Sequence, residues 1–362
     1  MAPGTTRLLV DHARPFVEVH FPESDRRALA WLDTGGGAFI VGQALGRDLA
    51  LEPTVEEIDG EQHETIEIPH VTVAERGLNT SAAIAVRFPG DLITEGFAAE
   101  AFIPARVLAQ HNVVFDYRGG TFSLDAEDDP IGTRVDAPSF PPPGTAWPAV
   151  TVNLAGEYVH LLLDTGASCC MLSDKLLERL EAKVSARTPG AFGFANMSAG
   201  PLDTQVETVR LPDLTWGDVH VPSVIAVSRP EGNFERMMSS GMPVPVEGAI
   251  AGNVLRHLRV EWRASDHAVW LDGEDLPTEQ LCQVPVVLFA TEGAMRITRL
   301  GESAEAMGLR VGDELVSVDG VAVSGFGATV ELLRGSPGER RNLELRRDGE
   351  NVTVDTEVVE VV

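Results

Sequence analysis

Two Asp-Thr-Gly triplets are the residues of this chain whose types and spacing could do chemistry. They begin at Asp33 and Asp164, and each follows a short apolar run, AWL in the first case and LLL in the second. A carboxylate at the end of a buried strand is costly unless something satisfies or uses it. Two carboxylates within about 3 Å of each other cannot both ionise, so one keeps its proton. Such a pair could activate a water, one member acting as general base and the other as general acid, with the two roles unassigned by the sequence.

The residues that follow each aspartate suit this task. Thr34 and Thr165 offer hydroxyl groups that could hydrogen-bond across the pair. Gly35 and Gly166 allow a tight backbone turn and present amide donors to the carboxylates. An ordinary polar turn is the alternative for a single triplet. Two copies, each after an apolar strand, favour a catalytic pair.

The elements that must position these residues are repeated along the chain. Apolar strands at 28–32 and 161–163 lead into the two aspartates. Two further pairs of segments match each other. They are 82–90 with 223–232, and the hairpins 114–125 with 260–273. Between the halves, 126–148 is rich in Asp and Pro and is expected to be a linker.

Composition excludes several classes of function. The net charge of −27 argues against nucleic acid and anionic membranes as partners, because both require clustered Lys and Arg. No stretch approaches the roughly 18 apolar residues of a membrane span. A cytoplasmic location is the default expectation, with a secreted or periplasmic one open if a signal peptide was removed. The three cysteines suggest no disulfide framework, and neighbouring Cys169 and Cys170 are expected to be apolar fillers rather than redox sensors.

The segments WLDTGG and LLLDTGAS resemble the active-site loops of retropepsin-like aspartic proteases. The resemblance implies a mainly β fold with two pepsin/retropepsin-like β-barrel lobes in tandem, at 1–125 and 149–275. It implies that Asp33 and Asp164 are the catalytic pair, and that no metal and no organic cofactor takes part. The residues expected to support the active-site loops are Thr34, Gly35, Thr165, Gly166 and Ser168.

In that family the substrate lies extended between the lobes, under glycine-containing flaps. The resemblance points to Gly60 for the flap of lobe one, and to Gly193 and Phe194 for the flap of lobe two. Exposed hairpins without a function are the alternative in both places. In lobe two, AIAG (249–252) resembles the family's apolar-apolar-Gly motif, which packs behind the catalytic loop. In lobe one we expect Glu100 at the position of the motif glycine, with Gly96 as a substitute in a shifted register.

The last part of the chain, 284–362, resembles a PDZ domain of the circularly permuted type attached to bacterial proteases. GLRVGDELVSVDG is the segment that carries this resemblance. A helix is expected from Ser303 to Gly308, and a second one at about 328–333. The resemblance implies that an extended peptide adds to an open strand edge. The residues expected to bind that peptide are Gly293, Ala294, Met295, Arg296 and Ile297. A closed domain that merely packs on the protease lobes is the alternative.

Together these observations predict an aspartic endopeptidase whose PDZ-like domain recruits protein or peptide substrates. The alternative is a catalytically inactive peptide-binding scaffold built from the same lobes. Because one chain carries both triplets, we expect a monomer, with a dimer left open.

Overall fold

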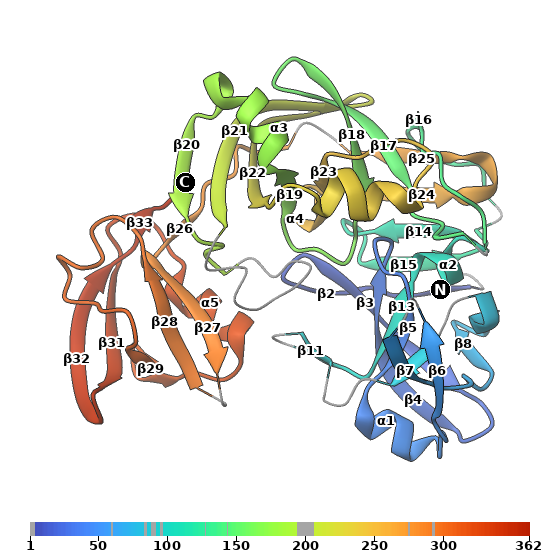
Figure 1. Cartoon of the computed structure of the whole chain (residues 1–362), viewed down its shortest axis with the longest axis horizontal. Helices are drawn as coiled ribbons and strands as arrows, with labels where there is room; N and C mark the ends of the chain where they lie inside the picture. The colour runs from blue at the N-terminus through green and yellow to red at the C-terminus, as the bar shows by residue number, and fades with distance from the viewer. Residues whose placement is uncertain are drawn as a thin grey trace.

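A computed structural model describes residues 4–58, 61–82, 85–87, 92–94, 97–126, 128–142, 144–193, 206–273, 276–291 and 294–362. Strands hold 47% of the residues and helices 14%, which confirms the predicted mainly β class. Figure 1 shows three parts: lobe one at the lower right, lobe two above it, and the PDZ-like domain at the lower left, beside lobe two.

Lobe one is built on a ten-stranded sheet in which β4 lies between β3 and β13. Strand β4 is apolar on the face that meets the core, where Ala30 and Leu32 are fully buried. The strands are β2 (Leu9–Asp11), β3 (Arg14–Phe21), β4 (Arg26–Asp33), β5 (Phe39–Val41), β6 (Thr54–Ile58), β7 (Glu61–Thr65), β8 (Val71–Val73), β9 (Arg76–Leu78), β10 (Ala85–Arg87) and β13 (Ala101–Pro104). Strands β11 (Leu92–Thr94) and β12 (Phe97–Ala99) form a separate pair, and the helices are α1 (Gln43–Asp48) and α2 (Ala105–Leu108).

Lobe two is built on a seven-stranded sheet, and its central strands repeat the arrangement of lobe one. Ser173 begins α3 as predicted, because its side chain accepts a hydrogen bond from the Leu176 amide at 3.1 Å. The strands are β17 (Ala149–Leu154), β18 (Glu157–Leu163), β19 (Cys170–Ser173), β20 (Ala186–Pro189), β21 (Glu207–Trp216), β22 (Val219–Arg229) and β23 (Gly248–Ile250). The helices are α3 (Asp174–Arg179) and α4 (Gly252–Leu255), with a π-helix at Asn233–Met238.

A six-stranded sheet joins the two lobes, in the order β1-β15-β14-β24-β25-β16. The two hairpins predicted as a repeat meet at its centre, where β14 pairs with β24 in antiparallel register. The predicted linker contributes a strand to this sheet, since β16 pairs with β25. The strands are β1 (Thr5–Arg7), β14 (Asn112–Asp116), β15 (Thr121–Leu124), β16 (Thr133–Asp136), β24 (Arg259–Arg263) and β25 (Ala268–Asp272).

The PDZ-like domain has its own sheet, in the order β27-β28-β29-β31-β32, with β30 on β29. Helix α5 (Phe326–Leu333) packs against β27 and β29. The strands are β27 (Val286–Thr291), β28 (Ala294–Leu300), β29 (Glu314–Val318), β30 (Val321–Ala322), β31 (Arg340–Arg347) and β32 (Glu350–Glu357). Strands β26 (Cys282–Gln283) and β33 (Val359–Glu360) pair with each other where this domain meets lobe two.

One predicted helix of the PDZ-like domain is wrong. Residues 302–308 form successive turns rather than a helix. Ser303 has a φ of +71°, which does not suit the extended backbone of a helix N-cap. The predicted hairpin turns at Asp319-Gly320 and Asp348-Gly349 are confirmed, with positive φ at both residues of each turn.

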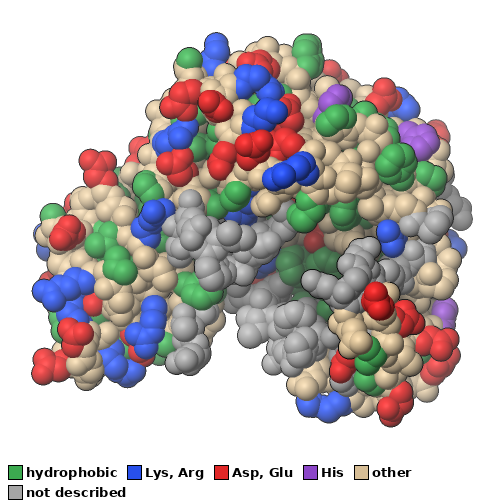
Figure 2. Space-filling view, in the orientation of Figure 1, with side chains coloured by type: hydrophobic (Ala, Val, Ile, Leu, Met, Phe, Trp, Pro, Cys, Tyr) green, Lys and Arg blue, Asp and Glu red, His purple; other side chains and the backbone are tan. Residues whose placement is uncertain are grey.

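The apolar core follows these divisions. One cluster of buried side chains runs through both lobes and their joining sheet, and another fills the PDZ-like domain. A smaller cluster joins lobe two to β27. Figure 2 shows acidic and basic side chains mixed over lobe two, and a notch between the PDZ-like domain and lobe one. Among the described residues, no helix combines the length and the hydropathy that crossing a bilayer requires.

Candidate active site

Each aspartate stands at the end of a strand that is paired on both sides. Strand β4 ends at Asp33, between β3 and the parallel strand β13. Strand β18 ends at Leu163, one residue before Asp164, between β17 and the parallel strand β23. Because the flanking strands fix each strand end, the two turns have little freedom to move.

The two threonines tie the turns together across the lobes. The Thr34 hydroxyl donates to the Leu163 carbonyl at 2.5 Å, and the Thr165 hydroxyl donates to the Leu32 carbonyl at 3.0 Å. The Thr34 hydroxyl also accepts from the Thr165 amide at 3.0 Å, and the Thr165 hydroxyl accepts from the Thr34 amide at 3.1 Å. Both side chains are fully buried. The predicted supporting role of Thr34 and Thr165 therefore has a symmetric geometric basis.

The glycines let the carboxylates meet. A Cβ atom on Gly35 would lie 2.8 Å from the Cγ of Asp164, and a Cβ on Gly166 would overlap the carboxyl group of Asp33. Each turn thus packs its glycine on the other lobe's aspartate. Real Cβ atoms do not approach this closely, so even alanine would force the two turns apart.

The two carboxyl groups hydrogen-bond to each other, and they differ in their surroundings. The Asp33 carboxylate accepts from the Gly35 amide at 2.6 Å, whereas Asp164 accepts from Gly166 and Ala167 at 2.9 and 3.1 Å. Burial, followed by the charge of Asp164, raises the pKa of Asp33 well above its usual range. Burial raises the pKa of Asp164 to about 6, and the hydrogen bond from Asp33 opposes that rise. Both shifts favour a state in which the buried pair holds one proton.

Both lobes place a strand behind the aspartate turn, but the register predicted for lobe one is wrong. Strand β13 places Ile103 beside Leu32, as β23 places Ile250 beside Leu163. Ala105 therefore occupies the place of Gly252 and Glu100 does not, while Gly96 lies outside the described residues. The Ala105 amide donates to the Gly36 carbonyl at 3.3 Å, and the Gly252 amide donates to the Ala167 carbonyl at 3.0 Å.

Glu100 has a different role from the one expected. Its side chain forms an ion pair with Arg26, and its carbonyl accepts from the Gly42 amide at 2.8 Å. It corresponds to Glu247, which pairs with Arg179 in lobe two.

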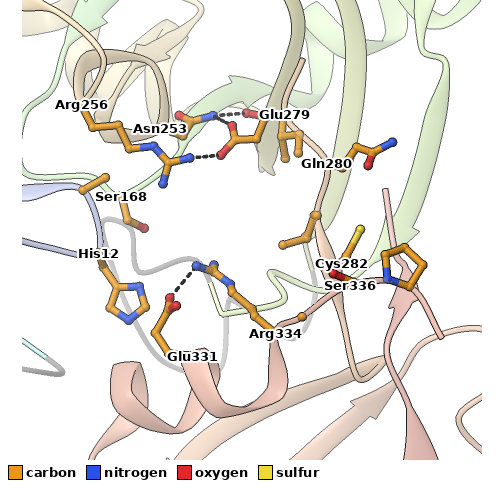
Figure 3. Close-up of a pocket in the computed structure, with 15 residues that line it drawn as sticks. His12, Ser168, Asn253, Arg256, Glu279, Gln280, Cys282, Glu331, Arg334 and Ser336 are labelled. Carbon is orange, nitrogen blue, oxygen red and sulfur yellow. Dashed lines mark hydrogen bonds and ion pairs between the residues drawn. The ribbon is translucent and has the colours of Figure 1, made fainter. Parts of the chain in front are cut away.

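Ser168 lies beside a cavity of about 520 Å³ where the three parts of the protein meet. Figure 3 shows Ser168 around this space with His12 of lobe one, Glu331 of α5 and Arg334, which follows α5 directly. Asn253, which follows the motif glycine, accepts from the Cys170 amide and donates to Glu279 on the cavity wall. Ser168 is 3% exposed, so this predicted site residue lies almost entirely inside the protein, at the wall of the cavity.

The predicted flap residues are only partly described. Gly60 and Phe194 lie outside the described residues, and the described strands β6 and β7 pair with each other. Gly193 is described, and it lies against Val330 of the PDZ-like domain. A role for Gly60, Gly193 and Phe194 over a substrate stays a prediction.

Strand pairing excludes one way in which the predicted peptide-binding residues of the PDZ-like domain could act, namely addition of a peptide strand to β28. Gly293 lies outside the described residues. Ala294, Met295, Arg296 and Ile297 belong to β28, which pairs with β27 on one side and β29 on the other. A strand with both edges paired cannot accept a peptide strand. The edge of the sheet belongs to β27 instead.

Sequence reasoning missed Trp147, whose indole donates to the Gly36 carbonyl at 3.1 Å. The repeat of the two lobes contains a signal for this residue. Trp147-Pro148 stands before β17 at the position that Arg14-Pro15 takes at the start of β3. Cys169 and Cys170 are buried, and burial raises the pKa of both thiols, as expected of apolar fillers. Within the described ranges, no group of three or more His, Cys, Asp and Glu side chains could hold a metal ion.

Comparison with known families matches two parts of the chain. Residues 150–240, which include Asp164, match a family model described as Aspartyl protease. Residues 301–347 match a family model described as PDZ domain. Both agree with the resemblances drawn from the sequence. The chain therefore carries an aspartyl protease domain followed by a PDZ domain.

Proposed function

We propose that this protein is an aspartic endopeptidase that hydrolyses peptide bonds with a water held between Asp33 and Asp164. The observation that carries the proposal is the symmetric junction of the two turns. Its threonine hydrogen bonds link the lobes, and burial raises the pKa of both aspartates. Two ordinary surface turns would have no reason to be buried face to face.

In the proposed reaction, Asp164 takes a proton from the water as the water oxygen attacks the peptide carbonyl carbon. Asp33 gives its proton to the carbonyl oxygen, which forms a neutral diol. The proton on Asp164 then moves to the amide nitrogen as the carbon–nitrogen bond breaks. Asp33 regains a proton from one of the diol hydroxyls, so the pair returns to its starting state.

The PDZ domain is proposed to recruit the substrate by binding a peptide segment, and the monomer to be the active unit. Support for the monomer comes from the cross-lobe hydrogen bonds, which join two turns of a single chain. Sedimentation of the active protein tests it. Activity confined to a dimer would count against it.

Cleavage of a diverse peptide library, followed by mass spectrometry, tests the catalytic proposal. Asp33→Asn and Asp164→Asn should each abolish cleavage, because each removes one of the two proton-transfer groups. Cleavage that persists in both variants would exclude this pair. Absence of cleavage by the natural sequence at every pH from acid to neutral would favour a peptide-binding scaffold instead.

A further inference from the structure

The PDZ domain has a groove between its edge strand β27 and helix α5. Helix α5 packs beside β27, and the Val284 amide donates to the Leu333 carbonyl at 2.9 Å, which closes one end. Val287 of β27 and Val330 of α5 belong to the two elements that face each other here. Among the described strands, β27 pairs only with β28, so no described strand occupies its other edge.

Val287 and Val330 are buried, although neither belongs to the core of the PDZ domain. Their side chains are 1% and 2% exposed, and the domain's own apolar cluster contains neither. Val287 instead belongs to the cluster that joins lobe two to β27, together with Ala191 and Phe192. The groove is therefore covered by another part of the same chain.

The covering segment is Gly190–Gly193, whose sequence is Gly-Ala-Phe-Gly. A Cβ on Gly190 would overlap Val287, and a Cβ on Gly193 would overlap Val330. Phe192 is fully buried, and its ring lies 3.2 Å from the position that a Cβ on Gly301 would take. The segment thus brings its backbone onto both valines, and its Phe192 ring packs beside Gly301, near the start of β27.

This close approach depends on glycine at both contacts. Gly190 and Gly193 have φ values of +105° and +81°, which side-chain-bearing residues rarely adopt. Because these glycines have no Cβ atom, their backbone can lie against the two valines. The chemistry that the groove accepts can therefore be read from the segment itself: an apolar aromatic residue flanked by small ones.

We propose that the groove is a peptide-binding site occupied by the protein's own Gly190–Gly193 segment. A partner peptide that presents an aromatic residue between small residues binds there by displacing this segment, and its backbone then adds to the edge of β27. The inference rests on the peptide-binding role proposed above for the PDZ domain. It does not depend on peptide hydrolysis.

An attached segment competes at an effective concentration in the millimolar range, so a free peptide binds the natural protein weakly. The probe is a fluorescent peptide with the sequence of residues 187–193, RTPGAFG, and binding is followed by fluorescence polarisation. Gly193→Val should displace the segment from Val330 and tighten binding by about tenfold or more. Gly156→Val is the matched control, because Gly156 also has a positive φ, +90°, but its Cβ would meet nothing within 4 Å.

A disulfide provides a reversible version of the test. The Cβ positions of residues 190 and 287 lie 3.5 Å apart, within the range that a disulfide spans. Gly190→Cys with Val287→Cys, in a Cys282→Ser background, should lock the segment in the groove. We expect the oxidised protein to bind no probe and the reduced protein to bind it, with near-ultraviolet circular dichroism reporting the fold of both.

Equal binding by the oxidised and reduced forms would overturn the inference while leaving peptide recruitment by the PDZ domain intact. Absence of binding in the natural, Gly193→Val and reduced proteins would overturn both this inference and the peptide recruitment proposed for the PDZ domain. The peptide-cleavage assay is read separately, since loss of hydrolysis in the aspartate variants says nothing about the groove.

Discussion

At the scale of single residues, the raised pKa values of the aspartate pair predict a pH dependence of hydrolysis. The activity should rise closer to neutral pH than the usual pKa of an aspartate would suggest. Burial raises the pKa of both carboxyls, that of Asp164 to about 6. The proposed reaction needs Asp164 ionised and Asp33 protonated. We expect kcat/KM to rise as the pH passes about 6, and to fall at higher pH when Asp33 loses its proton. A pH profile with a fluorogenic peptide checks this; a rising limb near pH 4, the usual range for an aspartate, would contradict it.

The same raised pKa predicts a gain in stability when Asp164 is replaced by Asn. A group with a raised folded-state pKa contributes stability at low pH and loses it as pH rises through that pKa. Asn cannot ionise, so Asp164→Asn should raise the free energy of unfolding at pH 8 by about 3 kcal/mol. The difference should vanish near pH 4. Urea unfolding at both pH values measures it, and an equal effect at both would rule out ionisation as the cause.

The threonine hydrogen bonds predict a further residue-scale effect. Thr34→Val keeps the shape of the side chain but leaves the Leu163 carbonyl and the Thr165 amide without their hydroxyl partner. Each unsatisfied buried group costs about 1–3 kcal/mol. We expect lower stability in urea and a loss of kcat. Thr34→Ser retains the hydroxyl and should keep most of both; equal losses in the Ser and Val variants would point to packing rather than hydrogen bonding.

At the scale of elements, the central strand pair of the joining sheet carries a buried charge. Glu261 on β24 is 1% exposed and pairs with Arg259 at 2.9 Å and with Arg263. Removing one partner of a buried ion pair leaves the other uncompensated, at a cost of about 3–5 kcal/mol. Glu261→Ala should therefore destabilise the lobes by about that much in urea.

The surface ion pair between Glu157 and Arg179 provides the matched control. Glu157 lies 2.8 Å from Arg179, and both side chains are more than 40% exposed. Exposed pairs contribute about 0–1 kcal/mol, so Glu157→Ala should change stability by no more than that. Comparable losses of stability in the two variants would show that burial does not increase the contribution of Glu261 to the free energy of unfolding.

Elements with a local signal could be predicted from the sequence. The Asp-Thr-Gly turns, the Ser173 cap and the two Asp-Gly hairpin turns depend on residues next to one another in the chain. The register of the motif in lobe one could not be predicted, because Pro104 and Ala105 stand where lobe two has Ala251 and Gly252. Only the pairing of β13 with β4 decides which residues match.

Pairing between strands also explains the two corrections in the PDZ domain. The residues of β28 carry the expected strand pattern, but the sequence does not say that strands will cover both of its edges. Residues 302–308 have a helical composition, and Ser303 nevertheless adopts a positive φ. In both places the sequence has the local pattern that was expected, but contacts with residues distant in the chain decide the structure.

At the scale of the whole molecule, the PDZ domain is held to lobe two at several points. Strand β33 pairs with β26, Arg210 of lobe two lies 2.7 Å from Glu360, and the Leu281 amide donates to the Val362 carbonyl. The apolar cluster behind these contacts also includes Cys169, close to the active-site turn. The sequence indicates the two domains by their resemblance to known families. No local pattern predicts the interface between them, because the residues that form it are distant in the chain.

This interface predicts that lobe two and the PDZ domain unfold together. Phe192 is fully buried in the cluster that joins them, so Phe192→Ala leaves a cavity and should cost about 3–5 kcal/mol. Because that loss falls on the contact between the domains, calorimetry should show one unfolding transition in the natural protein and two in the variant. Phe21→Ala removes an equally buried ring within lobe one, and should lower the transition temperature without dividing it. If Phe192→Ala instead gives a single lowered transition like that of Phe21→Ala, the cluster stabilises lobe two alone and does not couple it to the PDZ domain.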